Sequence, residues 1–93
     1  MNFNYGQRVR CIDVADGNGS VIGLTGTVRN FTLAYSEEEL IPWPGVEFDE
    51  EIANGHSLDD HETGEAIAWN RGWYCPPETL ISLEESINIE EII

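Results

Sequence analysis

The fold of this 93-residue chain is decided by residues 72–83, which have the sequence GWYCPPETLISL. An aromatic pair opens the stretch, and two prolines then end the strand because proline donates no ladder hydrogen bond. Glu78 and Thr79 fit one turn of 3₁₀ helix, which proteins use in short pieces as a connector. The apolar residues of 80–83 resume a strand. This order predicts the element that returns the last strand of a small barrel to its first strand.

The segments upstream of this closing stretch show the patterns of short strands. Residues 8–14 and 45–49 alternate apolar with charged side chains, and residues 26–31 are rich in β-branched and aromatic side chains. Residues 16–19, DGNG, are a dense cluster of turn formers. Because the chain has no long helical pattern, we expect a single all-β domain, a small and strongly bent barrel of about five strands.

Three other segments have weaker sequence patterns. Residues 36–39, SEEE, are expected to form a solvated acidic turn, and their spacing also fits the capping box of a single helical turn. Residues 50–71 have weak periodicity and predict a long inserted acidic loop, in which 66–69 fits a short strand. The tail, 86–93, carries four isoleucines and is expected to pack on the barrel or at a self-association contact.

Charge is the strongest compositional signal. The chain has 18 acidic and 4 basic residues, all arginine, for a formal net charge of −14. Such a surface repels phosphate backbones and acidic membranes and attracts basic proteins, so we expect no direct binding to nucleic acid or membrane. No apolar run approaches the roughly 20 residues of a membrane span, and the expected location is the cytoplasm. The alternative is that acidity only keeps the protein soluble.

Carboxylates spaced along an exposed strand and its loop can imitate a line of phosphates. A partner with an arginine-rich groove would be steered towards them, and an aromatic side chain would anchor the contact. A solvated face without a partner is the alternative. The candidate partner-binding residues are Glu37, Glu38, Glu39, Glu47, Asp49, Glu50, Glu51, Asp59, Asp60 and, as the aromatic anchor, Trp43.

One cluster has the residue types of a metal site. Imidazole nitrogen and carboxylate oxygen both suit zinc, and residues 56–61 supply four such groups. A bound metal would have a structural role, because it would pin a long loop that costs entropy to order. The alternative is two surface histidines in an acidic loop. The candidate metal ligands are His56, Asp59, Asp60 and His61.

Other signals for chemistry are poor. The chain lacks Gly-x-Ser-x-Gly, His-Glu-x-x-His and a phosphate-cradling glycine loop, so we expect no enzymatic activity. Cys11 and Cys75 have no Cys-x-x-Cys spacing and are expected to be reduced, buried thiols. These absences favour a protein that acts by binding.

Five short motifs follow one another along the chain: GQRVR at 6–10, GTV at 26–28, GVEFD at 45–49, GH at 55–56 and GWYCP at 72–76. Their order resembles small SH3-like barrel proteins of bacteriophages and mobile elements. The resemblance covers most of residues 6–83 and implies an SH3-like barrel. Members of that group often carry Gly-His before the loop and again before the closing tryptophan, where this chain has Asn70 and Arg71.

By size and acidity the chain is also similar to anti-CRISPR proteins. This resemblance implies a phage or mobile-element inhibitor that occupies the basic nucleic-acid-binding surface of a bacterial defence nuclease, such as Cas9, and blocks DNA loading. An SH3-like adaptor, whose exposed aromatic side chains bind a proline-rich peptide, is the second hypothesis. A small metal-assisted hydrolase is the third. Structural zinc is the one candidate cofactor, and the oligomeric state is left open.

Overall fold

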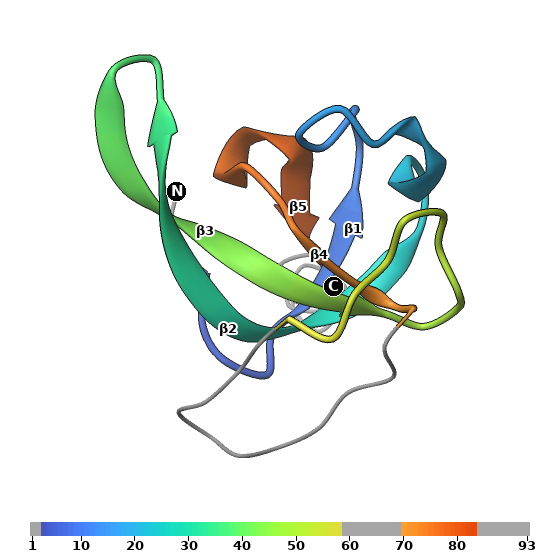
Figure 1. The fold of residues 1–93 in the computed structure, drawn as a ribbon. Coiled ribbons are helices and arrows are strands. Elements are labelled where there is room, and N and C mark those ends of the chain that lie inside the picture. The colour runs from blue at the N-terminus through green and yellow to red at the C-terminus, as the bar shows by residue number, and fades with distance from the viewer. Residues whose placement is uncertain (1–2, 59–69, 84–93) are drawn as a thin grey trace, which may run out of the picture.

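The computed structural model describes residues 3–58 and 70–83, which form one five-stranded antiparallel sheet (Figure 1). The strand order is β4-β3-β2-β1-β5, so the last strand pairs with the first. This confirms the predicted all-β class of about five strands. The elements are β1 (Arg8–Cys11), the 3₁₀ turn η1 (Gly19–Val21), β2 (Thr25–Ser36), β3 (Glu39–Phe48), β4 (Gly72–Tyr74), the 3₁₀ turn η2 (Pro77–Thr79) and β5 (Leu80–Ser82).

The closing stretch folds as its sequence predicts. After β4 the two prolines end the strand, and Pro77 opens η2. The Thr79 hydroxyl donates to the carbonyl of Pro76 at 2.7 Å, while the Thr79 carbonyl accepts from the backbone N–H of Ile12 at 2.8 Å. Leu80 then pairs with Cys11 of β1 and is fully buried. The turn therefore delivers β5 onto β1.

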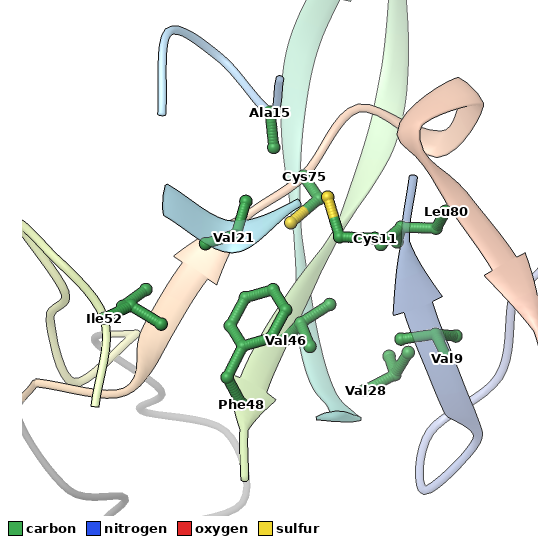
Figure 2. Close-up of a cluster of buried hydrophobic side chains, with 10 residues drawn as sticks. All are labelled: Val9, Cys11, Ala15, Val21, Val28, Val46, Phe48, Ile52, Cys75 and Leu80. Atoms are coloured by element: carbon green, nitrogen blue, oxygen red, sulfur yellow. The ribbon is translucent and has the colours of Figure 1, made fainter. Parts of the chain in front are cut away.

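The core lies on one side of the bent sheet (Figure 2). Phe48 is its largest side chain, and the predicted alternation holds because Val46 and Phe48 are buried while Asp49 is exposed. Burying a phenylalanine of this kind stabilises the fold by about 2–3 kcal/mol. The cluster consists of Val9, Cys11, Ala15, Val21, Val28, Val46, Phe48, Ile52, Cys75 and Leu80.

Residues 36–39 form the predicted solvated acidic turn, but the alternative of a helical turn is wrong, because these residues close a β-hairpin. Ser36 pairs with Glu39, and the two residues between them have positive φ values, 51° for Glu37 and 72° for Glu38. A two-residue hairpin with positive φ at both central positions matches the twist of its strands. Here the continuous ladder between β2 and β3 outweighs the local capping pattern.

Strand β3 begins at Glu39 rather than at the predicted residue 45, and it contains two prolines. The backbone N–H of Cys75 donates to the Pro44 carbonyl at 2.9 Å, so the backbone of β3 faces away from β2 at Pro44. Pro42, two residues earlier, faces the same way because strand geometry has a period of two. The missing N–H groups therefore remove no bond from the β2–β3 ladder.

Several smaller expectations differ from the structure or fall outside it. The first strand ends at Cys11 rather than at residue 14, and η1 begins at Gly19, the last of the turn formers at 16–19. The expected strand at 66–69 and the tail at 86–93 lie outside the described residues. Among residues 3–58 and 70–83, no helix is long and apolar enough to span a membrane.

Candidate functional site

The distal half of the β2–β3 hairpin extends beyond the rest of the sheet (Figure 1). Among residues 3–58 and 70–83, pairing with β1 stops at Thr27 and pairing with β4 stops at Gly45, so these residues give the hairpin beyond these points only two strands. Leu33, Tyr35 and Leu40 lie on one face of it, exposed by 64%, 71% and 50%. We call these three residues the hairpin patch. Apolar side chains grouped in this way mark an interaction surface.

An acidic tip, which we define as Glu37, Glu38 and Glu39, lies next to this patch. All three residues are exposed, and no ion pair within the described residues involves them. The positive φ values of Glu37 and Glu38 belong to positions that favour Asn-Gly. A residue with a Cβ pays roughly 1–2 kcal/mol in the left-handed region. The glutamates therefore oppose the stability of the turn that they form.

Two of the candidate partner-binding carboxylates, those of Glu47 and Asp49, already form ion pairs within the protein. Arg8 pairs with Asp49 at 2.5 Å, and Arg29 pairs with Glu47 at 2.9 Å. Hydrogen bonds from Arg8 are the main reason that the pKa of Asp49 falls to about 2. Arg71 adds a bond of 3.0 Å to the Asp49 carbonyl. These contacts leave Glu47 and Asp49 poorly suited to imitate free phosphates.

The remaining candidate partner-binding residues are dispersed. Glu50 and Glu51 are exposed beyond the end of β3, while Asp59 and Asp60 lie outside the described residues. Trp43 pairs with Thr32, on the face of the hairpin opposite to the patch, and is half-buried. Among the predicted residues that the structure describes, it therefore brings together only the acidic tip, and it adds the hairpin patch.

His56 is the one predicted metal ligand within the described residues. Its Nδ1 accepts a hydrogen bond from the backbone N–H of Leu58 at 3.1 Å, and its backbone bonds with Gly72. The ring lies 5.5 Å, centroid to centroid, from both Trp73 and Tyr74. Only Nε2 therefore remains for a metal.

The other three predicted ligands, Asp59, Asp60 and His61, lie outside the described residues. Within the described ranges, no group of three His, Cys, Asp or Glu side chains is placed to hold a metal ion. The zinc hypothesis therefore rests on the Nε2 atom of His56 and on the sequence of residues 56–61.

A polar lock that the sequence did not predict holds the segment after β3 against the sheet. Asn30, only 7% exposed, donates through Nδ2 to the Leu58 carbonyl at 2.8 Å and to the Tyr74 hydroxyl at 3.0 Å. The Tyr74 hydroxyl also donates to the Leu58 carbonyl at 2.5 Å. A β-bulge between Val28 and Asn30 turns Asn30 onto this face. Asparagine is depleted in strands, which was the available signal.

The two cysteines are buried free thiols, as predicted. Their sulfur atoms lie beside each other in the core (Figure 2). Hydrogen bonding with Cys75 lowers the pKa of Cys11 to about 7, while the same interaction and burial raise the pKa of Cys75. Because both residues are fully buried, the Cys11 thiolate is not an accessible nucleophile.

No protein-family model, curated protein or solved structure matches the chain. The likeness to phage SH3-like barrels and to anti-CRISPR proteins therefore stays a prediction from the sequence. The hairpin patch and the acidic tip are the features of the structure that bear on function.

Proposed function

We propose that this is a non-enzymatic binding protein that docks the end of its β2–β3 hairpin onto a basic surface of another protein. One observation carries the proposal: Glu37 and Glu38 hold turn positions with positive φ beside the exposed hairpin patch. Residues that break a local rule without a gain in stability are a signal of function. The fold gives no reason for glutamate at these two positions, whereas contact with a cationic partner gives one.

The net charge of −14 indicates the kind of basic surface that the protein would bind. A strongly acidic protein is steered over long range to cationic grooves, above all to those that hold nucleic acid. The proposed target is a bacterial defence nuclease, with a Cas9-type effector as the first candidate, and the proposed location is the cytoplasm of a bacterial host. The protein would occupy the groove and block DNA loading, as a phage or mobile-element inhibitor of the anti-CRISPR type.

The experiment is a capture assay against purified Cas9-type and other defence nucleases at about 50 and 500 mM salt, where screening differs strongly. The acidic tip is removed in a triple Glu→Gln variant at 37, 38 and 39. A matched control carries Asp13→Asn, Asp16→Asn and Glu78→Gln, at positions that are also exposed and lie outside the candidate partner-binding residues. Association should slow by about ten-fold in the tip variant and much less in the control. Equal effects of the two variants, or binding that ignores salt, would contradict the proposal.

A peptide-binding adaptor is the second candidate, favoured by the exposure of Tyr35 and of Tyr5 at 58%. Exposed aromatic side chains can bind a proline-rich segment in its extended conformation. Such binding would keep most of its strength at high salt and in the tip variant. The same capture assay therefore separates the two functions.

Structural zinc stays a proposal for His56, Asp59, Asp60 and His61, of which the described residues include His56, with its Nε2 atom free of the hydrogen bond that Nδ1 accepts. Metal analysis of the dialysed protein, compared with His56→Ala, checks it. Zinc bound in a one-to-one ratio and lost in the variant supports the site. A wild-type protein without metal, or zinc that the variant retains, excludes the zinc site. Zinc without hydrolytic activity excludes the hydrolase.

A further inference from the structure

Strand β2 has an open backbone edge beside the hairpin patch. Phe31 pairs with Pro44 and Leu33 pairs with Pro42 in the β2–β3 ladder. At its prolines, the backbone of β3 faces away from β2. Both pairs are therefore non-hydrogen-bonded pairs, in which the N–H and C=O groups of each residue point away from the partner strand. The N–H and C=O groups of Phe31, Leu33 and, by alternation, Tyr35 thus face outward. Among the described residues, no segment pairs with them.

The two edges of the hairpin are protected differently. On the β3 side, Pro42 and Pro44 stand at two of the three outward positions, next to Leu40, and offer no donor, a common device against strand addition. On the β2 side, the three outward residues all carry N–H groups and apolar side chains. This asymmetry leaves β2 open to pairing while β3 is blocked.

We infer that the partner binds by adding an extended segment to β2 at residues 31–35, an inference that rests on the proposed function. The segment runs antiparallel to β2, which is the more stable pairing. Its apolar side chains cover the hairpin patch, and Lys or Arg near its amino-terminal end meets the acidic tip. Strand addition gives affinity through main-chain hydrogen bonds and specificity through alternate side chains.

Charge selects this occupant over two others from the chain itself. A second copy would also carry a net charge of −14 and would bring like charge to the contact. The carboxyl-terminal segment, 84–93, contains four glutamates and no basic residue. The tail would bring further carboxylates to this edge, and a second copy would add its own large negative charge, whereas a basic segment neutralises the acidic tip.

The test uses the full chain and a synthetic peptide, acetylated and amidated, of sequence KKRTVTVTV. Amide exchange measured by NMR should be fast at Phe31, Leu33 and Tyr35 in the free protein and slowed by saturating peptide. If exchange at these residues is slow in the free protein and becomes fast when the chain is truncated after Leu83, the tail already pairs with the β2 edge. A dimer in sedimentation would show that a second copy does. Either result overturns the inference.

Two variants separate backbone pairing from side-chain contact. Leu33→Pro removes an outward donor and leaves the β2–β3 ladder intact, whereas Leu33→Ala removes only the side chain. The peptide should bind Leu33→Ala a few-fold more weakly than wild type, and Leu33→Pro about ten-fold more weakly again. Equal affinities for the two variants would overturn the inference.

Methylated peptides keep the test valid if Leu33→Pro does not fold. N-methyl groups on alternate amides give two peptides, and only the set that faces β2 should lose about ten-fold or more in affinity. Equal losses refute strand addition. The contrary outcomes are that the two Leu33 variants bind equally or that the two methylated peptides lose affinity equally. If binding then still depends on Glu37, Glu38 and Glu39, the proposed function stands without strand addition. Peptide and nuclease binding that both ignore these glutamates would remove the proposed function itself.

Discussion

Gly45→Ala should destabilise the protein sharply, because a methyl group at Gly45 has no space. The new Cβ would overlap Oδ1 of Asn30 and would lie 2.8 Å from Cε1 of Tyr74. Neither neighbour can retreat freely, since Asn30 and Tyr74 both hold the carbonyl of Leu58. The single methyl therefore strains the polar lock that fixes the segment after β3.

The magnitude follows from three effects. Overpacking costs about 1–3 kcal/mol, and each lost hydrogen bond of the lock costs about 1 kcal/mol. Alanine recovers roughly 0.5–1 kcal/mol because it restricts the unfolded chain. The expected loss of unfolding free energy is about 3 kcal/mol for Gly45→Ala. For Asn30→Ala it is about 1.5 kcal/mol, since the Leu58 carbonyl keeps the Tyr74 hydroxyl as a partner.

The double variant tests the reasoning. With Asn30 shortened, the main overlap disappears, so the double variant should lose about 3 kcal/mol rather than the sum of about 4.5 kcal/mol. Urea unfolding followed by tryptophan fluorescence measures all three. Gly19→Ala is the control, because its Cβ would meet only Val14 at an ordinary 3.8 Å. Strictly additive losses, or a loss at Gly45 no larger than at Gly19, would refute the steric argument.

Three further predictions follow from the ion pairs, the cysteines and the hairpin turn. The lowered pKa of Asp49, about 2 against an ordinary 3.8, stabilises the fold above pH 3.8, and this contribution disappears as pH falls through 2. The stability difference between wild type and Asp49→Asn should therefore shrink by about 1 kcal/mol in acid denaturation, a figure discounted for solvent exposure. A difference that does not change with pH would contradict this. Cys11 and Cys75 should react with a thiol reagent only as fast as the protein unfolds, because both are fully buried, and rapid labelling of the native state would be the contrary result. Glu37→Asn with Glu38→Gly should raise the unfolding free energy by about 1 kcal/mol and slow association with the basic partner, and unchanged stability would show that the turn is not strained.

The closing stretch could be predicted from sequence because its determinants are local. Prolines end the strand after Tyr74, and the apolar residues after Thr79 form the next strand. Strand β3 could not be placed correctly by the same logic. Whether Pro42 and Pro44 break a strand depends on which way their nitrogens face, and pairing with β2 decides that.

The candidate site was only partly visible for a related reason. Composition identified the glutamates, but it could not say which carboxylates already have partners. Arg8 reaches Asp49 and Arg29 reaches Glu47 only after the strands have found their register. Asn30 is similar, because its partners Leu58 and Tyr74 are 28 and 44 residues away along the chain.

The end of the hairpin departs from the requirements of the fold in three independent ways. Its turn carries Glu37 and Glu38 where asparagine and glycine would be more stable, its patch exposes Tyr35 by 71%, and its β2 edge lacks the prolines that guard β3. Each departure alone costs stability or invites aggregation. The proposed partner would correct all three at once, because it would neutralise the tip, cover the patch and pair with the edge. A purely solubilising role for the acidic residues would account for the charge but leave the patch and the open edge unexplained.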